Sequence, residues 1–72
     1  MELNDKQKNI LEELKNKELA TTKIAFLISA NLYQTQVYLE DLLKEKLIEH
    51  RDENNATYWK LTKKGDGVLN GL

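Results

Sequence analysis

The residues best suited to chemistry lie along a segment with helical spacing, about residues 32–46. A rotation of about 100° per residue places Gln34, Val37 and Lys44 opposite its apolar side, with Tyr33 beside them. A glutamine amide can bond the edge of an adenine, and an apolar side chain can contact the methyl group of a thymine. We therefore expect this face to read base edges in the major groove of double-stranded DNA.

The same helix carries carboxylates that would repel phosphate groups. They are Glu40, Asp41 and Glu45. A mixture of polar and charged side chains is also what any exposed helix face shows. Base reading by Gln34 and plain solvation of the face are therefore two open interpretations.

A predicted β-hairpin supplies a second candidate surface. The apolar spacing changes from helical to alternating at a strand of about residues 48–51, followed by a polar loop over 52–56 and a return strand over 57–61. We expect polar and cationic side chains of this hairpin, and a lysine just beyond it, to contact the DNA backbone. These residues are Arg51, Asn54, Asn55, Tyr58, Lys60 and Lys63.

Charge is unevenly distributed along the chain. Residues 44–64 hold six basic and four acidic side chains, whereas residues 1–43 hold five basic and seven acidic ones. The asymmetry favours phosphate contact by the hairpin end, since phosphates attract cations. A lysine-rich surface that only solubilises the protein explains the same asymmetry, and the whole chain is near neutral at −1.

Thr22 and Lys23 form a third candidate site at the start of a predicted second helix. Hydroxyls, free backbone N–H groups and a cation together suit a phosphate. Helix capping explains the threonines equally well, because Thr21 or Thr22 can serve as the N-cap.

These sites need a framework of helices. The first helix is predicted over about residues 5–16, with Asn4 as its N-cap and Gln7 completing a capping box. Asn31 is the expected N-cap of the third helix, and Thr62 that of a short final helix in which glycines cost about 1 kcal/mol each.

Apolar spacing predicts the core. Leu32 is expected to anchor the turn before the third helix, and Trp59 and Leu61 to face inward from the return strand. The remaining predicted core positions are Ile10, Leu11, Leu14, Ile24, Leu27, Ile28, Thr35, Leu39, Leu42 and Leu43.

Composition excludes several classes of protein. Seventy-two residues predict a single domain, 1–72, and the chain has no cysteine and one histidine, so we expect neither disulfide nor metal site. No nucleophile, base and orienting group fall in a recognisable motif and no glycine-rich phosphate loop is present, which predicts no enzyme, cofactor or small-molecule substrate. A polar, acidic N-terminus and the lack of an apolar run of about 18 residues predict a cytoplasmic protein that does not contact membranes.

Four motifs in one order carry a family resemblance. They are K-I-x-x-x-I-x-A-N-L (23–32), Y-L-E-x-L-L (38–43), L-I (47–48) and W-K-L-T-K-K-G (59–65). The chain resembles small archaeal winged helix-turn-helix DNA-binding proteins and transcriptional regulators. The resemblance implies a mainly α fold with a small β-hairpin (α+β): three helices, a two-stranded wing and a short C-terminal helix.

The resemblance also carries functional expectations. It implies binding of double-stranded DNA, with the third helix in the major groove and the wing, about residues 48–61, on the backbone. Lys46 departs from the family pattern, which has a left-handed glycine there. Coiled-coil members dimerise through a long C-terminal helix, whereas this chain ends at Leu72, so a homodimer is an expectation without an assigned interface.

Two rival functions remain open at this point. A protein-interaction module is favoured by the near-neutral charge and the acidic residues of the third helix, and winged helices can serve as adaptors. Single-stranded nucleic acid could stack on Tyr33, Tyr38 and Tyr58, but stacking platforms usually form on sheets and these tyrosines are scattered.

Overall fold

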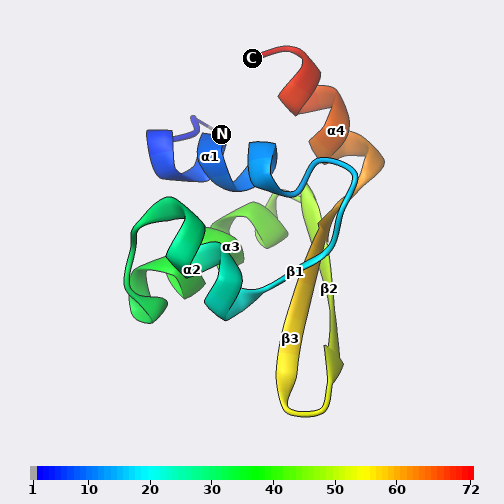
Figure 1. The fold of residues 1–72 in the computed structure, drawn as a ribbon. Helices are drawn as coiled ribbons and strands as arrows, with labels where there is room; N and C mark the ends of the chain where they lie inside the picture. Colours follow the sequence, from blue (N-terminus) through cyan, green and yellow to red (C-terminus); the bar gives the residue numbers. More distant parts are fainter. Residues whose placement is uncertain (1) are drawn as a thin grey trace.

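Residues 2–72 of the computed structural model form four helices and a three-stranded antiparallel sheet (Figure 1). The elements in chain order are α1 (Asp5–Glu13), β1 (Leu19–Ala20), α2 (Thr21–Ile28), α3 (Leu32–Lys44), β2 (Ile48–Glu53), β3 (Ala56–Leu61) and α4 (Lys63–Asn70). The hairpin of β2 and β3 projects from the helices at the end opposite α4. The predicted winged helix-turn-helix architecture is confirmed, and β1 adds a short third strand by pairing with β3.

The predicted caps of the first and third helices are present. Asn4 accepts a hydrogen bond from the Gln7 backbone N–H at 2.7 Å, and the Gln7 side chain accepts one from the Asn4 N–H at 3.2 Å, which completes the capping box. Asn31 caps α3 by accepting from the Gln34 N–H at 2.7 Å. The first helix ends at Glu13 rather than near residue 16, because the chain turns through a left-handed Asn16 with φ of 61°.

The predicted threonine cap of α2 is wrong. Helix α2 begins at Thr21 itself, and its N-cap is Ala20, which has no side-chain hydrogen bond to offer. Ala20 is still paired with Tyr58 in the sheet, so the chain passes directly from β1 into the helix. The Thr21 hydroxyl is used elsewhere, because it accepts the Trp59 indole N–H at 2.8 Å.

The core lies between α1, α2, α3 and the base of the hairpin. Trp59 is 2% exposed, which confirms its predicted place. Leu32 is 53% exposed, so its predicted role as a core anchor is wrong: it is the first residue of α3 and lies at the rim beside the hairpin tip. The other buried apolar side chains are Ile10, Leu11, Leu14, Ile24, Ala25, Ile28, Leu39, Leu42, Leu47 and Ile48.

The hairpin is longer and its turn tighter than predicted. Glu53 pairs with Ala56, which leaves Asn54 and Asn55 as a two-residue turn with φ of 50° and 65°. Positive φ at both central residues defines the turn whose twist matches that of the strands. The wing therefore ends in two amide side chains.

Two positions elsewhere explain how the chain changes direction. Lys46, which follows α3, has φ of 62°, as expected for the left-handed position that glycine occupies in the family pattern. Thr62 caps α4 by accepting from the Gly65 N–H at 3.0 Å, as predicted. Gly65 also allows α4 to pack closely, because a Cβ there would lie 1.9 Å from the Leu47 carbonyl oxygen. Within residues 2–72, no helix is sufficiently long and apolar to cross a bilayer.

Candidate nucleic-acid interface

The outer face of α3 has the exposure that base reading would require. Tyr33 is 79% exposed and Val37 39% exposed, and Gln34 is exposed beside them. The opposite face is packed into the core, where Thr35 and Leu39 are both 0% exposed. The side chains of the outer face are thus presented by a helix that is fixed from behind.

A groove separates the start of α3 from the tip of the wing. It brings together three residues predicted from sequence, Thr22, Tyr33 and Asn55, although they come from three separate elements. Its full lining is Ala20, Thr21, Thr22, Leu32, Tyr33, Gln36, Asn55, Ala56 and Thr57. None of these nine residues carries a formal charge.

Leu32 and Gln36 are groove residues that sequence reasoning missed. Helical spacing placed Leu32 on the buried side of α3, and that inference fails because this first residue of the helix lies at the rim of the core and is 53% exposed. Gln36 is exposed, and its amide lies 3.5 Å from the Glu40 carboxylate one turn on. Only the distance between the wing tip and α3, which the sequence does not contain, could have identified them.

Arg51 differs most from its expected role as a free phosphate ligand. Its Nε and Nη2 donate to the Glu18 carboxylate at 3.0 and 2.7 Å, and its Nη1 donates to Glu53 at 2.7 Å. The guanidinium also lies over the Tyr58 ring, 4.8 Å from its centroid. We name this set of residues, Arg51, Glu18, Glu53 and Tyr58, the arginine clamp.

The arginine clamp alters the titration of its members. The hydrogen bond from Arg51 lowers the pKa of the Glu18 carboxyl, and the two carboxylates raise the pKa of the Arg51 guanidinium. Two carboxylates around one guanidinium leave the cluster with a formal charge of −1. The arginine is thus charged but already paired, and Glu18, which sequence reasoning did not single out, is its main partner.

The predicted lysines are dispersed. Lys60 pairs with Glu49 across the hairpin at 3.4 Å, and Lys23 lies over the Phe26 ring at 5.6 Å. Lys44 and Lys63 are exposed and form no ion pair within residues 2–72.

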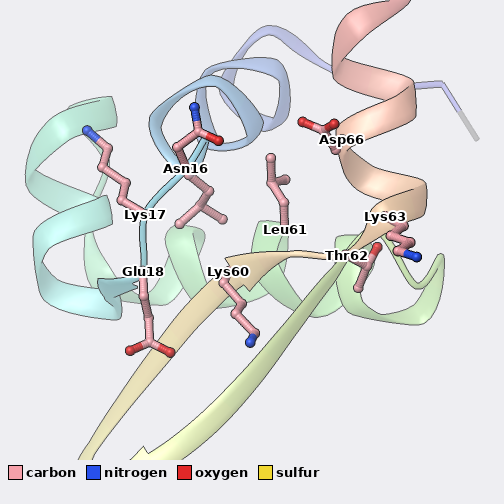
Figure 2. Close-up of a pocket in the computed structure, with 9 residues that line it drawn as sticks. Asn16, Lys17, Glu18, Lys60, Leu61, Thr62, Lys63 and Asp66 are labelled. Atoms are coloured by element: carbon pink, nitrogen blue, oxygen red, sulfur yellow. The ribbon is translucent and has the colours of Figure 1, made fainter.

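Lys60 and Lys63 do not belong to the groove. They line a separate cleft between the end of α1 and the start of α4, where Figure 2 shows Lys60 on β3 and Lys63 at the start of α4. Lys17 lines the same cleft and pairs with Glu13 at 3.8 Å. The structure therefore divides the predicted sites into an uncharged groove that includes Thr22, Tyr33 and Asn55, an outer α3 face, and lysines that lie elsewhere.

The described residues hold no constellation for a metal. No group of three or more histidine or carboxylate side chains within residues 2–72 is arranged to ligate an ion. The groove presents amides, hydroxyls and apolar atoms. These groups can bind a ligand through hydrogen bonds and van der Waals contacts.

Solved structures with a similar fold include bacterial regulators. The adhesin competence repressor AdcR from Streptococcus pyogenes matches with a TM-score of 0.90 at 19% identity, over 97% of this chain and 55% of that one. A mutant of ZitR from Lactococcus lactis, solved in complex with DNA, matches with a TM-score of 0.86 at 25% identity, over 96% of this chain and 49% of that one. This chain thus spans about half the length of those proteins.

A third similar structure is shorter. A fragment (1–100) of a candidate transcriptional regulatory protein from Mycobacterium bovis matches with a TM-score of 0.82 at 28% identity, over 93% of this chain and 70% of that one. The same fragment in solution is described as a homodimeric winged helix-turn-helix DNA-binding domain.

Family comparison agrees with the geometry. No curated protein sequence matches the chain. Residues 7–72, which include every element from α2 onward and most of α1, match the family described as winged helix-turn-helix. The chain belongs to the winged helix-turn-helix family.

Proposed function

We propose that this chain binds double-stranded DNA as a transcriptional regulator, with α3 in the major groove and the wing along the backbone. The observation that carries the proposal is the uncharged groove, because it places the start of α3 and the tip of the wing side by side. A duplex offers a base-edge surface flanked by a sugar–phosphate strand, and in this proposal α3 contacts the base edges while the wing contacts the strand.

Similar proteins support this proposal. The ZitR mutant was solved with DNA, and the Mycobacterium bovis fragment is a homodimeric DNA-binding domain. We further propose that residues 1–72 form a single domain that resembles the small archaeal regulators, acts in the cytoplasm as a homodimer, and is not an enzyme. A homodimer would present two α3 helices to successive half-sites about one helical turn apart.

The charge distribution sets the expected character of binding. Arg51 and Lys60 are paired with carboxylates of the same chain, so three of the five cations predicted to contact DNA remain without an ion pair among the described residues, Lys23, Lys44 and Lys63. We expect the logarithm of the association constant to fall with salt at a slope corresponding to about two to four released ions per protomer. Lys44, Lys63 and Lys23 are the proposed contributors to this ion release, and Thr22 is proposed to form an uncharged hydrogen bond with a phosphate.

The direct test is fluorescence anisotropy with mixed-sequence duplexes at about 50 mM salt, where phosphate contacts are strongest. Binding is expected, and Lys44→Ala should weaken it on every duplex. Lys15→Ala is the matched control, because Lys15 is an exposed lysine just beyond α1, on neither α3 nor the wing. Absence of binding to any duplex at this salt concentration would overturn the proposal.

The second candidate function is docking of a basic protein. The observation that favours it is the pair of exposed carboxylates, Glu40 and Asp41, on α3. Tyr33→Ala separates the two functions, because it removes a side chain of the groove without touching either carboxylate. Loss of duplex affinity in Tyr33→Ala supports DNA binding. The adaptor function is supported instead if Tyr33→Ala still binds a basic protein partner and Glu40→Gln does not.

A further inference from the structure

We infer that the reading surface of this chain recognises A·T base pairs rather than guanine. This inference rests on the proposed binding of duplex DNA and specifies its sequence preference. The first two turns of α3 carry it, and the amides at the tip of the wing are compatible with it.

Helix α3 up to residue 43 lacks the side chains that most often read guanine. Bidentate contact of arginine or lysine with guanine O6 and N7 is the commonest specific contact in the major groove, and residues 32–43 contain neither residue type. Lys44 is the last residue of α3, whereas a recognition helix contacts base edges mainly through its N-terminal residues. Glu40 and Asp41, which could accept from cytosine, also lie beyond the first two turns.

The side chains that α3 does present match an A·T pair. Gln34 is exposed, its side-chain amide has no partner within residues 2–72, and an amide can bond adenine N6 and N7 together. Val37 lies one turn further along and is 39% exposed, so part of its apolar surface is accessible to a ligand. A thymine methyl group in contact with Val37 and an adenine edge bonded to Gln34 would together specify A·T base pairs at adjacent positions.

The wing tip has the corresponding minor-groove chemistry. Asn54 and Asn55 project at the turn, and asparagine can read the A·T pattern of the minor groove. The chain's single arginine is held by Glu18 and Glu53 in the arginine clamp, three residues from the tip. The tip therefore relies on amides, with no cation of its own.

The first experiment identifies the preferred duplex. Full-length protein selects from a pool of duplexes with a randomised central segment at about 50 mM salt. The selected sequences are expected to be enriched in A·T pairs at the positions nearest α3. Enrichment of G·C pairs there overturns this inference but leaves the proposed function standing, whereas failure to bind any duplex overturns the proposed function and this inference with it.

The second experiment removes single chemical groups from the selected duplex. Replacing thymine by uracil deletes the C5 methyl group and keeps the pairing, and should weaken binding at one position by about four-fold, the equivalent of one buried methyl group. Replacing adenine by 7-deazaadenine deletes N7 and should weaken binding by about five-fold or more at the Gln34 contact.

Protein variants assign each effect to its residue. Val37→Ala should bind the thymine and uracil duplexes equally, whereas Val37→Ile keeps a branched side chain and should retain the difference. Gln34→Ala should lose sensitivity to 7-deazaadenine only. Circular dichroism checks that each variant is folded, and neither Val37 nor Gln34 belongs to the buried core. Equal binding of thymine and uracil duplexes by the unmodified protein at every position overturns the assignment.

Discussion

The two faces of the wing hairpin use their polar groups in opposite ways. On the inward face, Trp59 is buried, lies against His50 at a ring-centroid distance of 5.1 Å, and donates to Thr21. On the outward face, Arg51 and Lys60 are each paired with carboxylates across or beside the hairpin. The polar groups of the inward face attach the wing to α2, whereas the carboxylates near the outward face neutralise the cations of that face.

This difference indicates where binding affinity can arise. Paired cations on an exposed surface contribute little to stability, and they are partly unavailable to phosphates. The groove at the junction of α2, α3 and the wing tip contains no formal charge, so its contacts must be hydrogen bonds and apolar contacts. An interface of this kind gains specificity from shape and base edges more than from long-range attraction.

The greatest loss of stability is expected when the hydrogen bond between Trp59 and Thr21 on the inward face is removed. Thr21→Val keeps the shape of the side chain but removes the oxygen that accepts the Trp59 N–H, and a buried donor without a partner costs about 1–3 kcal/mol. Urea unfolding followed by fluorescence of Trp59, the chain's only tryptophan, measures the loss. Thr21→Ser retains the hydroxyl and should remain close to the unmodified protein; equal destabilisation by both variants would contradict the role of this bond.

The next effect is a gain in stability where α3 leads into the hairpin. Lys46 has φ of 62°, a conformation that costs a residue with a side chain about 1 kcal/mol and glycine almost nothing. Lys46→Gly should therefore raise the free energy of unfolding by up to about 1 kcal/mol, measured by urea titration. Lys44→Gly is the control with the opposite sign, because residue 44 is helical and glycine there costs about 1 kcal/mol.

These cases also show what the sequence could predict. Caps at Asn4, Asn31 and Thr62 were predictable because a capping bond joins residues three apart in the chain. Trp59 was predictable because alternation in a strand reports which face is buried. Local rules thus gave the architecture and most of the core.

The failures have a common physical reason. Thr21 bonds a residue 38 positions away, and Arg51 bonds Glu18, 33 positions away. Leu32 has the helical phase of a core residue, yet the helix extends past the core at that point. Pairing across the fold decides whether a polar side chain remains free for a ligand, and nothing in the local spacing reports such pairing.

Weakening the arginine clamp should make a cation of the outward face available to DNA while the inward face is unchanged. Glu18→Gln removes the charge that holds Arg51 through Nε and Nη2, and the freed guanidinium can then turn to a phosphate. We expect affinity for any duplex to rise by a few-fold and the salt dependence to steepen, both measured by anisotropy. Glu13→Gln removes a charge of the same type from the Lys17 pair and should change neither; unchanged affinity in Glu18→Gln would show that Arg51 stays on Glu53.

The smallest expected effect is a dependence of stability on pH. The pKa of Glu18 is lowered in the folded chain from its ordinary value of 4.5, mainly by the hydrogen bond from Arg51, so the folded state binds this proton less readily than the unfolded state. The stabilisation is therefore complete above pH 4.5 and is lost as the pH falls through the lowered pKa. Urea midpoints measured from pH 6 to pH 3 should decline less steeply in Glu18→Gln than in the unmodified protein. Because the pair is exposed, the difference should be small and should shrink further in high salt, whereas a difference that persists in high salt would mean that the arginine clamp is shielded from solvent.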